Sequence, residues 1–220
     1  MGADARRVAL DLFCEHELDV EELAARHPQC GCEGAQSSAG SPGPVKHEEK
    51  VRLFLTSTSD IKGKRHAQRK ERPFKPQSLK RAFTTELSVV RLTHSSAKEL
   101  EYSASLLHNY QSEREPMYGG LLSVVDFPVS AVRMNVDGLG AMCVFETPCK
   151  VEEDGSFKRP SHADIANSAY GLTKEENMAK RQIIYNQIVE HGTQCRVEDV
   201  DDCNLIPFLP KIVKDEGSAQ

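Results

Sequence analysis

The chain lacks tryptophan, and only 6% of its 220 residues are aromatic, so a hydrophobic core must be built mainly from aliphatic side chains. It also lacks an apolar run that approaches the roughly 18 residues of a membrane span. The N-terminal segment MGADARRVALDLFCEHELD is amphipathic and contains acidic residues, unlike a signal or transit peptide. With 28% charged residues, the composition is typical of a globular protein, and we expect no membrane partner.

Motifs of several common catalytic classes are missing as well. The sequence contains no glycine-rich phosphate loop, no GxSxG nucleophile elbow and no HExxH helix. Seven cysteines are present, but their number is odd and their spacing is irregular. Without an export signal, these features favour reduced thiols and a cytoplasmic location over a disulfide framework. Cys143 lies in an apolar run and is expected to be a small core residue.

Residues 1–33 carry helical signals. Their apolar spacing, with Asp19 as a cap, predicts a short helical hairpin. The phrase LDVEELAARH is typical of the first helix of a helix-turn-helix, but the PQCGCEG that follows cannot form a recognition helix. The sequence therefore favours a helical appendage over a DNA-reading motif.

The same segment contains the best candidate metal site. Zinc is commonly held by four cysteine or histidine ligands, and a metal would stabilise a unit too small to bury much apolar surface. The candidate ligands are His27, Cys30, Cys32 and either Cys14 or His16. The alternative is an apolar Cys14 on a helix followed by a surface CGC loop. CxH and CxC are not the usual zinc spacings, and helical residues two positions apart point in different directions.

Composition divides the rest of the chain. Residues 34–45 consist mostly of Gly, Ser, Ala and Pro, which predicts a flexible linker. Residues 46–85 are predicted to be an exposed basic segment that begins with a short helix or strand, HEEKVRLFL. We expect an α+β domain over residues 86–213 and a disordered tail over residues 214–220.

Strands are expected at four places in that domain. ELSVVRL at 86–92 alternates as a strand that places Leu87, Val89 and Arg91 on one face. Further strands are expected at 119–127, 129–136 and 141–148. The last two are predicted to be joined by a hairpin loop that begins with Asp137-Gly138.

Two capping boxes predict two helices. Ser96 and Glu99 open a helix whose inward positions are Leu100, Ala104 and Leu107. Thr173 and Glu176 open a longer helix, ended by Gly192, whose core-facing positions are Met178, Ile184, Tyr185 and Ile188. The predicted fold is α+β, with a small, mostly antiparallel sheet and two packing helices, preceded by the helical hairpin.

Charge is distributed unevenly. The segment KGKRHAQRKERPFKPQSLKR at 62–81 has a net charge of +8, so the rest of the chain carries −13 of a total of −5. Its basic residues are Lys62, Lys64, Arg65, Arg69, Lys70, Arg72, Lys75, Lys80 and Arg81. Such a stretch can neutralise several phosphates of a nucleic acid, and Phe74 and Phe83 could stack on an unpaired base. The alternatives are a solvated loop, a contact for an acidic protein surface, or neutralisation of the protein's own acidic face.

A third candidate site would be catalytic. RPSHADIANSAYG at 159–171 is interpreted as a polar loop between a strand and a helix, where Asp164 could orient the imidazole of His162. Alternatively, Asp164 caps a short helix. His94 could add a base and Arg91 an anion-binding group. Strand alternation, however, places Arg91 and His94 on opposite faces.

These features favour a cytoplasmic accessory protein of a larger complex that contacts a nucleic-acid backbone, DNA or RNA, through its basic stretch. Two alternatives remain open. One is a small enzyme acting on a phosphate-bearing substrate, such as a nuclease or nucleotide transferase. The other is an interaction module whose basic loop binds an acidic partner. The sequence does not determine the oligomeric state.

Overall fold

The computed structural model of the chain describes residues 42–55, 74–84, 86–114, 123–134, 136, 139, 141–147, 149–151, 157–167 and 172–196. The strands are β1 (Lys50–Leu55), β2 (Leu87–Arg91), β3 (Ser123–Pro128), β4 (Met142–Glu146), β5 (Cys149–Val151), β6 (Phe157–Arg159), β7 (His162–Asn167) and β8 (Thr193–Arg196). The helices are the 3-10 helices η2 (Pro76–Phe83) and η3 (Val129–Ala131) and the α-helices α4 (Ala97–Arg114) and α5 (Lys174–His191).

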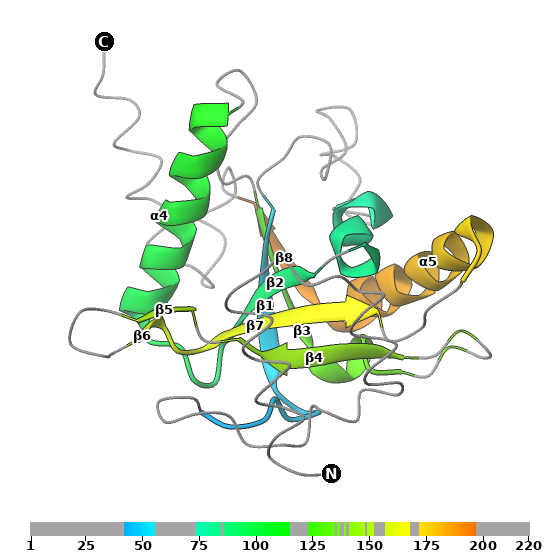
Figure 1. Ribbon diagram of the computed structural model, residues 1–220, viewed down its shortest axis with the longest axis horizontal. Helices are drawn as coiled ribbons and strands as arrows, with labels where there is room; N and C mark the ends of the chain where they lie inside the picture. Colours follow the sequence, from blue (N-terminus) through cyan, green and yellow to red (C-terminus); the bar gives the residue numbers. More distant parts are fainter. Residues whose placement is uncertain are drawn as a thin grey trace.

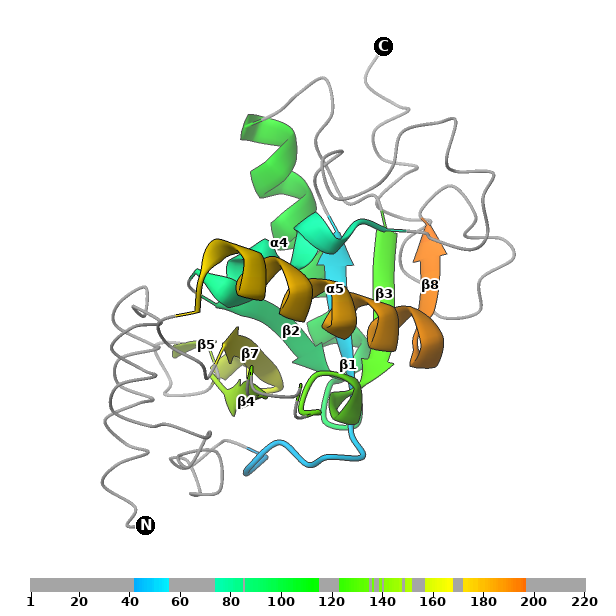
Figure 2. The same ribbon diagram turned by 90° about the vertical axis from the view of Figure 1, so that its right-hand side faces the viewer.

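Six of the strands form one antiparallel sheet in the order β4-β7-β2-β1-β3-β8, and β5 pairs separately with β6. The two long helices lie on opposite sides of this sheet: in Figure 2, α5 crosses in front of the strands and α4 stands behind them. This arrangement confirms the α+β class and the mostly antiparallel sheet (Figure 1). The predicted hairpin at 1–33 and the tail at 214–220 lie outside the described residues. No helix in the described part of the chain is long and apolar enough to cross a membrane.

Helix α5 begins and ends where its sequence signals predict. The Glu176 amide donates to the Thr173 hydroxyl at 3.2 Å, and the Thr173 amide donates to the Glu176 carboxylate at 2.7 Å, which completes the capping box. The helix ends at Gly192, where a Cβ would clash with the carbonyl oxygens of Ile188 and Asp126. Glycine therefore permits the close approach of α5 to β3.

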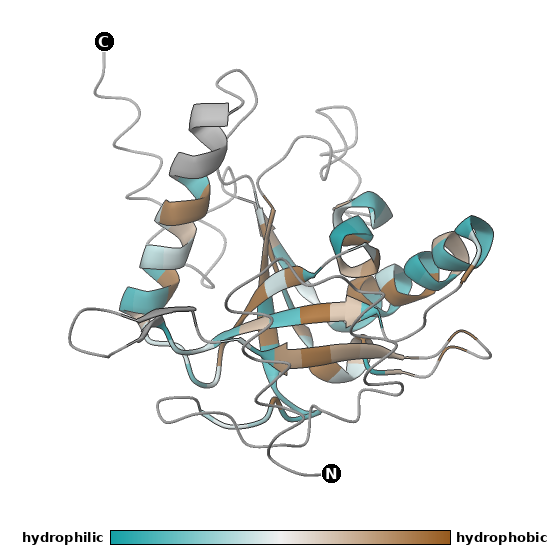
Figure 3. Ribbon diagram, in the orientation of Figure 1, coloured by the Kyte–Doolittle hydropathy of each residue, from teal (hydrophilic) through white to brown (hydrophobic). Residues whose placement is uncertain are grey.

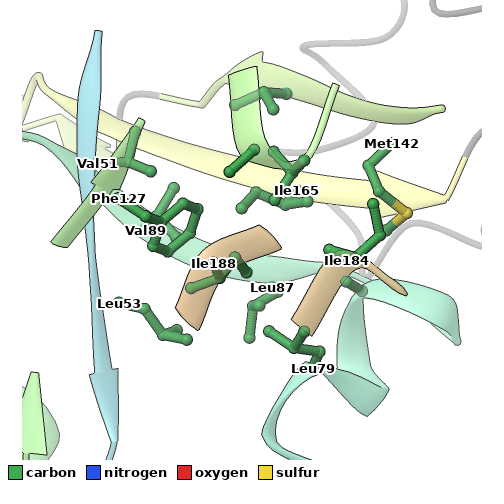
Figure 4. Packing of buried hydrophobic residues seen from close by; sticks show 14 of the residues in the cluster. Val51, Leu53, Leu79, Leu87, Val89, Phe127, Met142, Ile165, Ile184 and Ile188 are labelled. Atoms are coloured by element: carbon green, nitrogen blue, oxygen red, sulfur yellow. The ribbon is translucent and has the colours of Figure 1, made fainter. Parts of the chain in front are cut away.

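The hydrophobic core lies between α5, η2 and the face of the sheet that they cover, which we call the α5 face. Ile184 and Ile188 of α5 point toward apolar side chains of the strands, and Leu79 of η2 closes one side (Figure 4). The Tyr185 hydroxyl donates to the Phe74 carbonyl at 2.8 Å, and the two rings meet edge to face with centroids 4.8 Å apart. Figure 3 shows hydrophobic stretches within the strands and hydrophilic stretches on η2 and α5.

One core position of α5 is predicted wrongly. Ile184, Tyr185 and Ile188 are buried as expected, but Met178 is 52% exposed. Lys180 occupies the inward position instead, since positions 180, 184 and 188 repeat every four residues along one helix face. Met178 is therefore exposed because of its position around the helix, although its side chain is hydrophobic.

The sheet extends farther toward the N-terminus than the predicted domain boundary at residue 86. Strand β1 belongs to the segment predicted to be exposed, yet it lies between β2 and β3 and all its residues from 51 to 55 are buried. The end of the predicted linker is also packed: Val45 is buried, and Gly43 adopts a φ of 91°, a conformation that favours glycine. The Gly43 carbonyl accepts a hydrogen bond from Arg91 Nη1 at 2.6 Å.

The strand predicted at 129–136 does not form as one continuous element. Pro128 ends β3, and the chain turns into η3, whose Val129 and Ala131 are buried in the core. The Val129 amide donates to the Glu49 carbonyl at 2.9 Å, which extends the β1–β3 register by one residue pair, and the Val132 amide then donates to the Val129 carbonyl at 3.1 Å within η3. The hairpin loop predicted at Asp137 and Gly138 lies outside the described residues, whereas β4 confirms the strand expected at 141–148.

The cysteines differ from the sequence-based expectation. Cys143 is buried as predicted, but Cys143 and Cys195 are both disulfide-bonded. Because β4 and β8 are the opposite edges of the sheet, these two cysteines do not pair with each other. Disulfides persist in oxidising compartments, so the argument from reduced thiols no longer supports a cytoplasmic location, which stays an untested prediction.

Candidate functional site

The side of the sheet opposite to α5, here called the α4 face, carries buried charged side chains. Strand alternation directs Arg52 and Phe54 of β1 to this face. Arg52 Nε and Nη2 each donate to a carboxylate oxygen of Asp126 at 2.7 Å, and the strand register places these residues directly opposite each other. Their side chains are 3% and 7% exposed. This bidentate ion pair is therefore shielded from water.

His162 and Asp164, the predicted catalytic pair, lie on the same face of β7. The Thr147 hydroxyl donates to Asp164 Oδ2 at 2.6 Å and lies 2.8 Å from His162 Nδ1. The Thr147 carbonyl also lies 2.8 Å from Nδ1, which identifies this ring nitrogen as the donor. The structure thus brings the predicted pair together through Thr147. It does so on a strand, not on the loop or helix expected at 159–171.

Burial keeps the imidazole of His162 neutral. Burial lowers the pKa of His162 below its ordinary value, and the nearby Asp164 carboxylate only partly offsets this effect. A neutral ring that donates through Nδ1 has Nε2 as an acceptor. His162 can therefore offer a hydrogen-bond acceptor to a ligand that reaches it.

A cavity of about 240 Å³ lies between α4 and the strands, and His162 lines it. Its apolar walls include Phe54, Val90, Leu106 and Leu107. Ser103 of α4 also lines it; this residue is fully buried, and its hydroxyl has no hydrogen-bond partner among the described residues. An unsatisfied buried hydroxyl is costly. The cavity therefore combines apolar walls with two polar groups that a ligand could satisfy.

A second hollow, of about 330 Å³, lies where β1 and β2 separate. These strands pair only at Val51–Arg91 and Arg52–Val90, whereas β1 pairs with β3 along its whole length. Figure 2 shows the two strands diverging toward η2. The hollow is lined by the diverging strand ends and by residues 77–81 of η2, except for Leu79.

The two hollows adjoin each other, and we call them together the α4 groove. They share Phe54, Ser88 and Leu107 as lining residues. Arg159 lines the first hollow, and Lys80 and Arg81 line the second. An apolar groove with cationic side chains in both of its parts suits a ligand that has a flat apolar portion and several negative charges.

The basic stretch is described only at its end. Lys75, Lys80 and Arg81 fall within the described residues, and the six basic positions from 62 to 72 lie outside them. Lys80 and Arg81 are exposed, and the contact of Arg81 with Glu86 at 3.3 Å is a surface pair of small energetic value. Phe74 is fully buried, so its predicted stacking on a base is wrong. Phe83 packs against the core, and Phe54 is the aromatic residue of the groove.

Arg91 and His94 lie at another place, beside Glu49. Arg91 is fully buried on the α5 face and donates to both carboxylate oxygens of Glu49 at 2.8 Å. Strand β2 ends at Arg91, and the following turn brings His94 Nε2 to 3.6 Å from the same carboxylate. The four predicted catalytic residues thus form two groups, one centred on Glu49 and one on Thr147, on opposite faces of the sheet.

The charge of Glu49 is satisfied internally. Burial raises the pKa of Glu49, but hydrogen bonds from Arg91 and from the Lys46 backbone outweigh this effect, so the pKa lies below its ordinary value. Arg91 is further engaged by the Gly43 carbonyl and by Glu146, whose carboxylate lies 3.5 Å from Nη1. The arrangement holds the N-terminal end of the described domain in place, and an anionic substrate would have to displace these carboxylates.

Lys180 is a buried cation that no sequence motif indicated. Its ammonium group donates to Asn167 Oδ1 at 2.6 Å and to the carbonyl oxygens of Leu139 and Ala141 at 2.8 and 3.0 Å. Burial lowers the pKa of Lys180 to about 8. Since all three ammonium hydrogens have acceptors, this lysine connects α5 to the β4–β7 edge of the sheet.

Two residues of the groove were missed by sequence reasoning for different reasons. Ser103 lies four positions before Leu107 and three after Leu100, so a polar residue in the inward stripe of α4 was a detectable signal. Thr147 was not detectable, because its role depends on the pairing of β4 with β7. The sequence pattern therefore identified His162 and Asp164 but not the groups that connect them.

Comparison with known proteins provides no assignment. No family model matches the chain, and no curated protein or solved structure is similar to it. Within the described residues there is no group of three or more histidine, cysteine or acidic side chains that could hold a metal. The predicted zinc ligands in residues 14–32 lie outside the described residues.

Proposed function

We propose that this protein binds a nucleic-acid strand by its phosphates, through the basic stretch that ends at η2 and through the α4 groove beside it. The observation that supports this proposal is the position of Lys80 and Arg81. Both are exposed at the second hollow, next to apolar strand ends. Arg81 remains 64% exposed although it contacts Glu86 at 3.3 Å, in contrast to Arg52 and Arg91, whose side chains are buried against carboxylates.

The described residues on both sides of the basic stretch lie at the same hollow. Residues 56–73 connect Leu55 to Phe74, and Leu55 and the residues that follow Phe74 in η2 line this hollow. The most basic segment of the chain thus leaves and re-enters the described domain beside Lys80 and Arg81. Several cations on one ligand give strong, salt-sensitive binding, because each phosphate contact releases counterions.

The test is a salt titration of binding to labelled DNA and RNA. The variant Lys80→Gln/Arg81→Gln should reduce the slope of log K against log salt by roughly 0.7 for each lost contact on a single strand. The matched control is Lys46→Gln/Lys174→Gln, which removes the same charge from exposed positions away from the groove. An unchanged slope in the first variant would remove η2 from the interface. An absence of binding at low salt would overturn the proposal and favour an acidic protein partner.

A further inference from the structure

We infer that the α4 groove receives one unpaired base of the bound strand, so that the protein selects single-stranded nucleic acid. This inference rests on the proposed function, and it concerns the first hollow, between α4 and the strands, where no phosphate contact is needed. Its starting point is Ser103, whose buried hydroxyl has no partner among the described residues. A hydroxyl in such a place is satisfied when a ligand supplies the missing hydrogen bond.

The polar groups of the hollow match the edge of a base. A base edge presents hydrogen-bond donors and acceptors side by side. His162 offers its Nε2 as an acceptor, because Nδ1 faces the Thr147 carbonyl at 2.8 Å, and Ser103 offers a hydroxyl that both donates and accepts. Both residues line the same hollow. A purely apolar ligand would leave these groups unsatisfied.

The size and the walls of the hollow also suit a base. Its volume of about 240 Å³ is below the range of about 300–1,000 Å³ that accommodates drug-sized ligands. Phe54, Leu106 and Leu107 supply apolar contact for a planar ring, and base–aromatic contacts are a general source of single-strand affinity. A base paired in a duplex cannot enter a hollow between a helix and a sheet unless it leaves the stack.

The cations lie where the phosphates of that nucleotide would emerge. Arg159 lines the hollow itself, whereas Lys80 and Arg81 line the adjoining one. The two hollows are neighbours, since they share Phe54, Ser88 and Leu107 as lining residues. A base in the first hollow and its neighbouring phosphate at η2 would therefore use apolar, polar and charged residues together.

Oligonucleotides that lack bases separate this inference from the proposed function. The full chain is titrated with a labelled single strand, with a strand of the same length composed of abasic sites, and with a duplex. We expect the abasic strand and the duplex to bind about 5- to 150-fold more weakly than the normal strand, the range that corresponds to loss of one base contact. The salt slope of the abasic strand should stay steep, because its phosphates remain.

Variants of α4 locate the effect. Leu107→Trp fills the groove and should reduce the affinity for the normal strand to that for the abasic strand, with an unchanged salt slope. Leu100→Trp is the matched control, since Leu100 lies on the same helix and does not line either hollow. Ser103→Ala adds no volume and should reduce the affinity for the normal strand but not for the abasic strand. It replaces Leu107→Trp as the test if that variant has a lowered melting temperature.

The outcomes distinguish the two proposals. Equal, salt-sensitive affinity for normal, abasic and duplex ligands would overturn the base pocket and retain phosphate binding. A second contrary result is that the abasic strand binds more weakly than the normal strand while neither Leu107→Trp nor Ser103→Ala changes that difference. This result would also overturn the base pocket, because the base contact would then lie elsewhere. No binding of any strand at low salt would overturn the proposed function and the base pocket together.

Discussion

The two faces of the central sheet are both buried, but they are built from different chemistry. On the α5 face, Ile184 and Ile188 pack on aliphatic side chains of the strands. On the α4 face, an Arg52–Asp126 ion pair and the His162–Thr147–Asp164 network lie at a similar depth. Apolar packing contributes stability in proportion to the area it buries, whereas buried charges contribute only when each has its partner.

This difference bears on strand register. Arg52 lies directly opposite Asp126, so β1 and β3 are aligned by a pair that only one register can form. A slip by one residue would move every side chain of β1 to the other face and place Arg52 in the aliphatic core. The α5 face alone would tolerate many combinations of aliphatic residues. The α4 face therefore supplies specificity of pairing, and it leaves a groove whose polar groups are available for function.

The largest expected effect is on the ion pair of the α4 face. Asp126→Ala should lower the free energy of unfolding by about 3–5 kcal/mol, because it leaves a buried guanidinium without its carboxylate. The double variant Arg52→Met/Asp126→Leu should be close to wild type, since both charges are removed together. Urea unfolding measures both. If the double variant were as unstable as the single one, the ion pair would itself stabilise the fold. The two faces would then not differ in how much stability they contribute.

The corresponding change on the α5 face tests packing. Ile188→Ala should cost about 2–5 kcal/mol, because Ile188 is fully buried and its removal leaves a cavity. Met178→Ala on the same helix should stay within about 0.5 kcal/mol, since Met178 is 52% exposed. Equal losses for the two variants in urea unfolding would contradict the assignment of Ile188 to the core.

A smaller effect on stability is expected when the pH changes the protonation of His162 on the α4 face. Burial lowers the pKa of His162 below 6.5 in the folded protein, so below pH 6.5 the unfolded chain binds a proton that the folded chain does not. Stability should therefore fall as the pH decreases from 6.5 toward the folded pKa. The lowered pKa of Glu49 adds its own loss only below about 4.5.

The variant His162→Gln isolates this titration. Between pH 6.5 and 5, its melting temperature should depend less on pH than that of the wild type, because the group that takes up the proton is gone. Thermal unfolding in a series of buffers makes the measurement. A pH dependence identical in the two proteins would show that other groups carry the effect.

The fold could be predicted where sequence signals are local. The capping box at Thr173 and the spacing of Ile184 and Ile188 define α5 within the helix itself. Strand β7 could not be predicted in this way, because His162 and Asp164 read as loop residues unless their buried partner is known. That partner, Thr147, lies on the neighbouring chain segment, and only sheet pairing brings it near.

The candidate site shows the same division. Charge alone identified Lys80 and Arg81 as an exposed basic surface, and the structure places them beside a groove. The groove itself arises because β1 and β2 stop pairing after Arg52 and Val90, a tertiary feature without a sequence signal. Local composition thus indicates which residues could bind a ligand, and non-local geometry determines which of them share a site.

The smallest expected change in stability concerns Ser103, and its sign is informative. Ser103→Ala should raise the free energy of unfolding by about 1 kcal/mol or less, because it removes a buried hydroxyl that has no partner among the described residues. Part of this gain comes from the higher helix propensity of alanine, roughly 0.5 kcal/mol, which Ser105→Ala on the same helix measures separately. Stabilisation combined with weaker binding of a single strand is the signature of a residue retained for function at a cost to stability. A loss of stability in Ser103→Ala would instead show that the hydroxyl has a structural partner, and Ser103 would then no longer distinguish the α4 face from the α5 face.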